Sequence, residues 1–434
     1  MKKKAITIAV CGALVSGMVG AQFYADHRLK EFYSLANQSK DQHIQKQTMK
    51  MDMGVWSGEA TWSYKVLVDP CQPDNFVIIK GVDHIQRSWN GYNIHSEIMP
   101  EISDAEAAKK YQEIFKNKAF IEADSKVNWF GSVDTKFKSV QLDQNKDGTH
   151  VLWKGIDGFI HLKQQQDRFD VKKFELNMPE FSMTSQEKAA NVSVKGVELS
   201  SGGDGFFGRT LASGKTNFVI KQMSFTPENT NKSVELNNLN VNYVVDVNAK
   251  QSSLENTWSI DQIKVNQQGF KNIKFNFKVA GLDTQAVQTS IDTINKINQQ
   301  CDIQQKDVLQ KQLMQDFVKV LAAGMSFTSE GNQIEAADAK LSANIKGQLM
   351  AHPYSSLDDV AATAPQKATL DAKAEMDKAF IRNVMQASGQ FTEKVSDQDY
   401  EMMLQELVQK THAKINGNKV EFGFTYKDGK PNFQ

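Results

Sequence analysis

A long alternation of apolar and polar residues, from about Ala123 to Ala280, constrains the fold of this chain more than any other feature. Stretches such as 215–226 and 271–282 keep a period of two and place β-branched or aromatic residues at the apolar positions. This period sends alternate side chains to opposite faces of a strand, so one face of the sheet is expected to be dry and the other wet. The sequence therefore predicts a long antiparallel meandering sheet with short turns.

Helices are expected on both sides of this strand-rich stretch. Ser103 and Glu106 form a capping box before one short helix, and Asp283 is placed to cap a helix over 284–298. A further helix over 307–324 carries one apolar stripe that is expected to pack on the sheet: Leu309, Leu313, Phe317, Val320 and Leu321.

Strands return over 325–350, and 355–365 is interpreted as a linker. Residues 366–386 and 397–414 are then predicted to be helical, before a terminal strand within 416–430. The predicted fold class is α+β and predominantly β, with a few packing helices and a preceding N-terminal membrane helix. Four segments are expected: a signal or anchor (1–21), a helical stalk (22–50), a β-rich body (51–356), and C-terminal helices with a terminal strand (357–434).

The N-terminus has the pattern of an export signal. Lys2, Lys3 and Lys4 precede an uncharged apolar run from Ala5 to Ala21. This run lies at the lower limit for crossing a membrane, and we expect it to stay as an anchor, with cleavage before Gln22 as the alternative. The lysines predict a cytoplasmic N-terminus, so the chain is expected at the bacterial inner membrane with its body in the periplasm. Lipid attachment at Cys11 is excluded because this cysteine lies inside the apolar run and follows a valine.

Charge and cysteine usage narrow the partners. The chain has 51 basic and 51 acidic residues, so it lacks the positive field that nucleic acid requires. Beyond Cys11, only Cys71 and Cys301 remain, and the periplasm oxidises thiols. A disulfide between them is one expectation, and two buried free thiols are the other.

Three local motifs resemble ligand sites but fail in detail. The segment "LDQNKDGTH" places Asp143, Asn145, Asp147 and Gly148 like a calcium loop, but Lys154 replaces the required glutamate, so a hairpin turn is predicted. Glycines 203, 205 and 208 have dinucleotide-binding spacing, yet a strand pattern follows them in place of a helix. The "GKT" at 214–216 lacks the earlier glycine of a phosphate loop.

No catalytic or metal centre is predicted. His84 and His95 flank what look like adjoining strands and could approach each other, but packing or surface roles are favoured over a zinc pair. Cys71 has no nucleophile signature. We therefore expect a non-enzymatic protein without a cofactor. The six tryptophans, at positions 56, 62, 89, 129, 153 and 258, are expected on strands and mostly in the core.

Four stretches resemble the YdgA-like family of bacterial proteins of unknown function. They are "GAQFYADHRLKEFY" after the apolar run, "GVWSGEATWSY" at 54–64, "VAGLDTQAVQ" at 279–288 and the closing "NKVEFGFTYKDGKPNF". This resemblance implies an inner-membrane-anchored protein that faces the periplasm, and it implies no activity. The strand-rich middle is also similar, at the level of fold, to AsmA-like envelope proteins that carry phospholipid in β grooves.

Function depends on what covers the apolar sheet face. Helices, a second copy of the sheet, or lipid acyl chains could do so, and ordinary sandwich packing is the expectation. The main hypothesis is a binding or assembly role in the cell envelope, with itself as a homodimer or with other envelope proteins. A lipid-binding groove, which requires an apolar face open to solvent, is the alternative. An envelope hydrolase is a third hypothesis, which a pocket holding a carboxylate of strongly raised pKa would revive.

Overall fold

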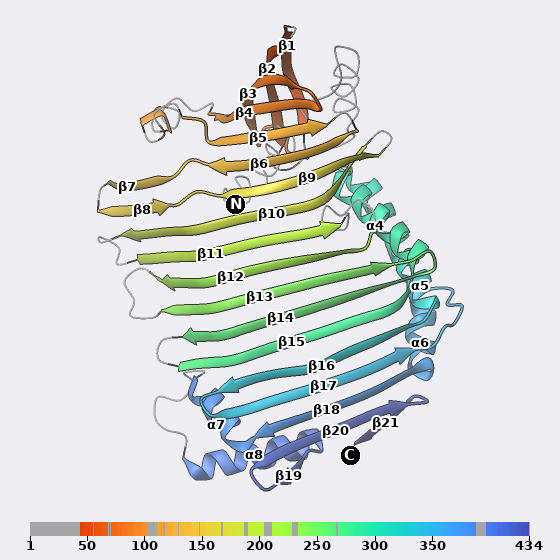
Figure 1. Cartoon of the computed structure of the whole chain (residues 1–434). Helices are drawn as coiled ribbons and strands as arrows, with labels where there is room; N and C mark the ends of the chain where they lie inside the picture. The colour runs from red at the N-terminus through yellow and green to blue at the C-terminus, as the bar shows by residue number, and fades with distance from the viewer. Residues whose placement is uncertain are drawn as a thin grey trace.

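The computed structural model describes residues 44–433 except positions 55, 68, 70, 103–108, 110, 114, 116–117, 129, 147, 166–167, 186–189, 204–210, 228–232, 266–267 and 388–395. The described strands form one 21-stranded antiparallel sheet that runs from one end of the molecule to the other (Figure 1). The predicted β-rich fold with a long meandering sheet is confirmed. The predicted anchor, most of the stalk and the Ser103–Glu106 capping box lie outside the described residues.

The first six strands follow one another as antiparallel neighbours. They are β1 (Ile44–Met53), β2 (Ser57–Leu67), β3 (Phe76–Ser88), β4 (Gly91–Glu101), β5 (Ile121–Asn128) and β6 (Ser132–Ser139). The predicted first hairpin is therefore present as β1 and β2.

The prediction of a helix as far as Lys50 is wrong, because β1 begins at Ile44 and pairs with β2 along its length. Met49, Met51 and Met53 of β1 pack against the core of the neighbouring strands. Strand pairing and this one-sided burial outweigh the helix propensity of a segment rich in Lys, Gln and Met.

The middle of the sheet is built from long strands. β10 (Arg168–Ser185) pairs on one side with both β9 (Asp157–Gln165) and β8 (Thr149–Trp153), and β8 forms a hairpin with β7 (Leu142–Lys146). β9 also pairs with β6 and so joins the middle to the first strands. Five long neighbours follow β10: β11 (Ala190–Gly203), β12 (Gly214–Thr226), β13 (Val234–Val247), β14 (Gln251–Val265) and β15 (Gln268–Asp283).

The sheet continues through the C-terminal strands. β16 (Met325–Ala336), β17 (Ala339–Leu349), β18 (Ala368–Asp377) and β20 (Lys419–Lys427) pair in that order, and β20 also pairs with β19 (Lys414–Asn416) and β21 (Lys430–Phe433). The terminal strand predicted from sequence is confirmed in β20.

Two predictions for 355–386 are wrong. The expected linker is a helix, α6 (Leu357–Lys367), whose first turn is capped by the Ser356 hydroxyl accepting from the Asp359 amide. The expected helix over 366–386 is instead strand β18 followed by α7 (Lys378–Ala387). Leu370, Ala372, Ala374 and Met376 share one face of β18, and pairing with both β17 and β20 outweighs the helix propensity of this Ala- and Lys-rich segment.

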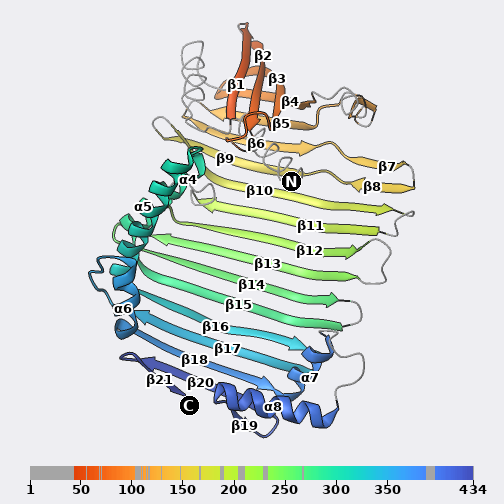
Figure 2. The same ribbon diagram turned by 180° about the vertical axis from the view of Figure 1, so that it is seen from behind.

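The helices lie at the margins of the sheet (Figures 1 and 2). α4 (Thr284–Gln299) and α5 (Ile303–Ala322) pack against each other beside the strand ends, and α7 and α8 (Asp397–Thr411) lie near the C-terminal strands. The helices predicted over 284–298, 307–324 and 397–414 are confirmed, and Asp283 caps α4 by accepting from the Ala286 amide. Within the α5 stripe, Val320 is buried but Phe317 is exposed, because α5 packs mainly on α4 rather than on the sheet.

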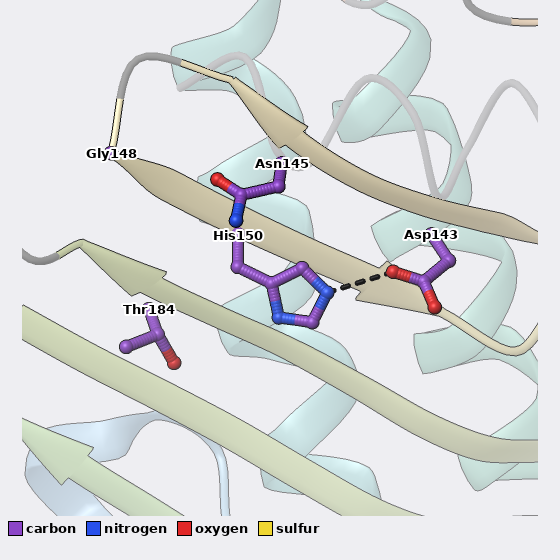
Figure 3. A pocket seen from close by; sticks show the side chains of 5 residues that line it. All are labelled: Asp143, Asn145, Gly148, His150 and Thr184. Atoms are coloured by element: carbon purple, nitrogen blue, oxygen red, sulfur yellow. Dashed lines mark hydrogen bonds and ion pairs between the residues drawn. The ribbon is translucent and has the colours of Figure 1, made fainter.

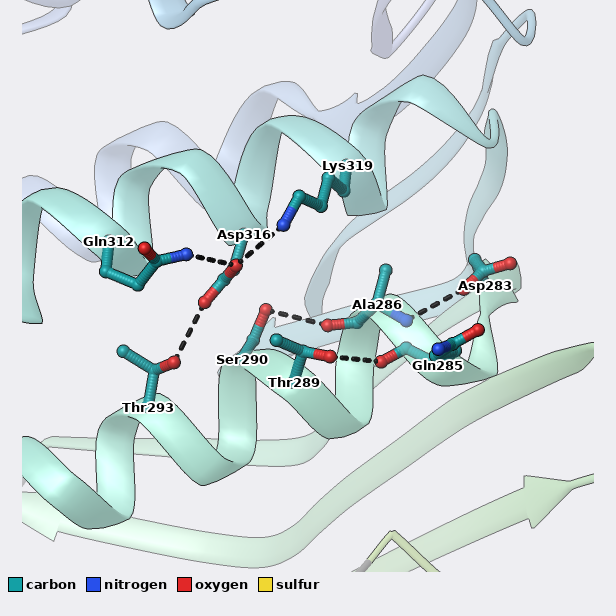
Figure 4. A network of polar contacts seen from close by, with 9 residues as sticks. All are labelled: Asp283, Gln285, Ala286, Thr289, Ser290, Thr293, Gln312, Asp316 and Lys319. Atoms are coloured by element: carbon teal, nitrogen blue, oxygen red, sulfur yellow. Dashed lines mark hydrogen bonds and ion pairs between the residues drawn. The ribbon is translucent and has the colours of Figure 1, made fainter.

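One buried carboxylate joins α4 to α5 (Figure 4). Asp316 accepts hydrogen bonds from Thr293 Oγ1 at 2.8 Å and Gln312 Nε2 at 3.0 Å, and Lys319 Nζ lies 3.3 Å away. Burial alone would raise the pKa of Asp316, but these partners hold it below its usual value. Asp316 is therefore a structural anion of the helix pair.

The largest core lies among the first strands and reaches into β9 and β10. Trp62 is almost fully buried there, and Phe174, Leu176 and Leu199 extend the cluster towards the middle of the sheet. By contrast, the exposed tryptophans contradict the expectation that most tryptophans are core: Trp56 is 78%, Trp89 93% and Trp258 48% exposed. Trp129 lies outside the described residues.

A row of left-handed residues crosses the middle of the sheet. Gly196 on β11, Asn238 on β13 and Asn272 on β15 have φ values of 60°, 53° and 50°, and Gly155 between β8 and β9 has 82°. At this row the apolar positions change phase, for example from Phe218 and Ile220 to Met223 and Phe225 on β12. A left-handed residue interrupts the regular pleat, so such a change can keep apolar side chains on one face.

Candidate functional site

The calcium-like segment is a hairpin, as predicted. Asp143 and Asn145 lie on β7 and His150 on β8, and Asp143 accepts a 2.7 Å hydrogen bond from or donates its acceptor oxygen to His150 Nε2 (Figure 3). With Gly148 and Thr184 these residues line a hollow of about 400 Å³. The carboxylate is thus engaged by a histidine, and Asp147 lies outside the described residues.

The other motifs also fall where the sequence placed them or beyond view. Lys215 and Thr216 of the "GKT" lie on strand β12, where no helix N-terminus can hold a phosphate. Of the three spaced glycines only Gly203 is described, at the end of β11.

His84 and His95 are opposite each other on β3 and β4, with ring centroids 6.5 Å apart. Each faces a carboxylate on its outer side: His84 lies 3.6 Å from Glu59, and His95 2.8 Å from Asp124. Within the described part of the chain, no group of three or more His, Cys, Asp or Glu side chains is arranged to hold a metal ion.

Cys71 and Cys301 are joined in a disulfide, with Cα atoms 5.1 Å apart. Cys71 lies between β2 and β3, and Cys301 lies between α4 and α5. The bond therefore ties the helix pair beside the middle strands to the N-terminal strands.

Asp83 has the raised pKa that could indicate an acid or base. Burial raises its pKa to about 7, against hydrogen bonds from Ser96 and from Trp62 Nε1, the latter at 2.9 Å. The same burial, with the Asp83 charge nearby, raises the pKa of Tyr64 to about 12. Asp83 is 0% exposed and lies within the packed N-terminal core, so no substrate could reach it. The condition that would revive a hydrolase, a pocket around such a carboxylate, is not met at Asp83.

The feature that sequence reasoning left open is the apolar face of the middle strands. Phe277 contacts Phe327 with ring centroids 6.3 Å apart, and Phe327 pairs with Gly347 of β17. Phe270 packs with Leu341, which lies on the same face of β17 as Gly347. Phe270 and Phe277 therefore share a face although an odd number of residues separates them, which shows that the row of left-handed residues keeps the apolar side chains together.

On this face, four rows of side chains cross β11 to β15 and none of their members is charged. Strand pairing defines the rows, which are Val194, Met223, Leu236, Ile263 and Phe270; Val197, Ile220, Leu239, Ile260 and Ile273; Leu199, Phe218, Val241, Trp258 and Phe275; and Ser201, Thr216, Tyr243, Asn256 and Phe277. We call this surface the open apolar face.

Large side chains of the open apolar face meet solvent. Trp258 and Phe275, directly opposite each other, are each 48% exposed, and Met223 and Tyr243 are exposed to a similar degree. A further partial row along its margin, formed by Met183, Phe225, Val234 and Val265, is equally exposed. No second sheet covers the described strands here, so the expected sandwich packing is wrong. Strand spacing of about 4.8 Å and a rise of about 3.3 Å per residue give the four rows an extent of roughly 20 Å by 23 Å.

The opposite face of the same strands is wet. It carries ion pairs between lysines and glutamates on neighbouring or alternate positions: Lys173–Glu175, Lys221–Glu198, Lys264–Glu235, Lys278–Glu255 and Lys346–Glu330. The contrast between an ion-paired face and an uncharged one identifies the open apolar face as the surface with a binding role.

Packed structure stands on the open apolar face at both of its ends. At one end, Leu199 joins the core of the N-terminal strands. At the other, Phe380 of α7 packs with Phe270, and Tyr400 and Leu404 of α8 pack beside Met376 of β18. The open stretch is therefore bounded along the length of the sheet by two filled cores.

The signal for this surface was present in the sequence. On each strand from β11 to β15, polar residues at two successive positions interrupt the alternation, as at Lys221 and Gln222 or Asn237 and Asn238. The repeated phase change predicts one continuous apolar face, but only the structure shows that nothing described covers it.

These features define the class: a β-rich protein with a long antiparallel sheet and an uncovered apolar face between two cores. The chain belongs to a family of bacterial proteins of unknown function (DUF945), whose model matches residues 1–433. The YdgA-like resemblance is compatible with this membership. No curated protein and no solved structure matches the chain. Among the helices of the described part, none is long and apolar enough to cross a membrane.

Proposed function

We propose that this protein is a non-enzymatic, membrane-anchored component of the bacterial cell envelope that binds lipid acyl chains on its open apolar face. The single observation that carries the proposal is four adjacent rows of uncharged side chains that remain in contact with solvent. Exposing such a surface is costly in water, so a ligand that covers it gains free energy at about 25 cal/mol per Å² of apolar area.

The two cores at the ends of the face favour acyl chains over a second copy of the sheet. Two sheets pack face to face about 10 Å apart, and α7 and the N-terminal strands stand on the same face at either end. A flexible chain can lie between these walls. One leaflet of a bilayer is about 15 Å thick in its hydrocarbon part, which matches the scale of the open rows.

The location follows from the sequence. The basic N-terminus and apolar run support an inner-membrane anchor with the body in the periplasm. The disulfide between Cys71 and Cys301 fits an oxidising compartment. A lipid-binding role beside a membrane is consistent with both.

The proposal is tested by native mass spectrometry of residues 22–434 exported to the periplasm and purified without detergent, followed by lipid extraction. We expect phospholipid at a fixed ratio in the wild type. Trp258→Glu, on the open apolar face, should lose most of it, whereas Ser259→Glu, on the opposite face of the same strand, should retain it.

Two results would overturn the proposal. A lipid-free monomer would show that the face needs no acyl chains, and a lipid-free dimer disrupted by Trp258→Glu would assign the face to self-association.

A further inference from the structure

Three aromatic side chains project from three turns at one end of the N-terminal strands. Trp56 in the β1–β2 turn is 78% exposed, Trp89 in the β3–β4 turn is 93% exposed, and Phe130 in the β5–β6 turn is 90% exposed. Aromatic side chains of this size are seldom left so accessible in a soluble surface, and three of them recur on alternate connections.

Strand pairing brings these turns together. Ser57, next to Trp56, pairs with Gln86, and the Arg87 amide donates to the Trp56 carbonyl at 2.9 Å. Gly91, at the end of the Trp89 turn, pairs with Asn128, where the Phe130 turn begins. The three turns thus form one continuous edge, which we call the aromatic edge.

The backbone of the aromatic edge satisfies its own polar groups. Asn128 Oδ1 accepts from the amides of Phe130 and Ser132 at 2.9 and 3.0 Å. The Gly131 carbonyl accepts from Gln164, and the Gly54 amide donates to the Ser57 carbonyl at 2.8 Å. Turns whose amides are paired locally can enter a less polar medium without the cost of unsatisfied peptide groups.

We propose that the aromatic edge docks on the membrane–water interface, with Trp56, Trp89 and Phe130 inserted among the lipid headgroups. Tryptophan favours this zone because its ring is apolar and its N–H is polar. Separate turn tips, each presenting one ring, suit a fluid surface that closes around them. This inference rests on different residues from the open apolar face and does not depend on lipid binding there.

Charge at the aromatic edge is mixed, so insertion rather than electrostatic attraction must supply the binding. The neighbouring strand ends carry acidic and basic residues in equal number: Asp52, Glu59 and Asp134, and Arg87, Lys126 and Lys163. We therefore expect docking on neutral phosphatidylcholine, with little gain from anionic lipid.

The test uses the full chain reconstituted in phosphatidylcholine vesicles whose acyl chains carry bromine, which quenches nearby tryptophan. Trp56→Phe and Trp89→Phe together should reduce the quenched component by at least twofold. Trp153→Phe is the matched control, since Trp153 is half-buried on β8 and away from the aromatic edge. Adding phosphatidylglycerol should leave the quenching unchanged.

Quenching that persists unchanged in the Trp56 and Trp89 variant, or that appears only with anionic lipid, would overturn the proposal. A third variant, Trp258→Phe, separates this outcome from the function of the open apolar face. A component lost with Trp258 reports acyl chains on that face whether or not the aromatic edge docks. All three tryptophans are at least 48% exposed, so folding of the variants is expected and circular dichroism checks it.

Discussion

Asp83 is the residue whose chemistry departs most from its surroundings. It is fully buried among apolar side chains of the N-terminal strands, and its pKa is raised from 3.8 to about 7. Because the folded state holds this proton more tightly than the unfolded state, the free energy of unfolding falls as the pH rises from about 4 to about 7. At about 1.4 kcal/mol per pKa unit, the loss from this group is at most about 4 kcal/mol.

We predict that Asp83→Asn removes this loss. The asparagine can still accept from Trp62 Nε1, and it carries no charge to bury. Denaturant unfolding at pH 5 and pH 8 should show the variant gaining about 1 to 3 kcal/mol on the wild type between the two values. Asp246→Asn, at an exposed position, should behave like the wild type at both. An unchanged pH dependence in Asp83→Asn would contradict a raised pKa.

Asn238 tests the row of left-handed residues. Its φ is 53°, and its Nδ2 donates to Asp261 at 2.7 Å. A β-branched residue is strained in this conformation, whereas glycine adopts it freely. Asn238→Val should therefore cost about 1 to 2 kcal/mol more in free energy of unfolding than Asn238→Gly. Equal losses would mean that the conformation is not required.

At the scale of elements, the disulfide is the covalent link between two distant parts. It closes a loop of 230 residues between the β2–β3 connection and the α4–α5 connection. In the chain-entropy model, a loop of this length stabilises the fold by about 4 to 5 kcal/mol. Cys71→Ser and Cys301→Ser should each lower the free energy of unfolding by up to that amount, and reductant should have no further effect on either. A wild-type midpoint that reductant leaves unchanged would contradict this role.

The sequence predicted elements well where the pattern was long and failed where local propensity opposed pairing. The alternation over 123–280 and the caps at Asp283 and before α8 gave strands and helices that the structure contains. β1 and β18 were mistaken for helix because their residues favour helices in isolation. Their strand state comes from partners distant in sequence, β2 for β1 and β20 for β18.

At the scale of the whole molecule, the decisive property is what the sheet leaves uncovered. A dry face could be foreseen from the alternation, but its coverage depends on where the helices settle. α4 and α5 pack on each other at the strand ends, and α7 and α8 cover only the C-terminal strands. Periodicity alone cannot specify these positions, and so the sequence could not decide between a filled core and an open face.

Lipid binding on the open apolar face is tested most directly by placing a photo-crosslinking benzophenone residue at single positions of the full chain in living bacteria. At Phe275, on the open apolar face, we predict adducts with phospholipid after irradiation. At Lys274, the neighbouring residue on the opposite face, we predict none. Crosslinks from position 275 to a second copy of the chain or to another protein, with no lipid adduct, would contradict the account.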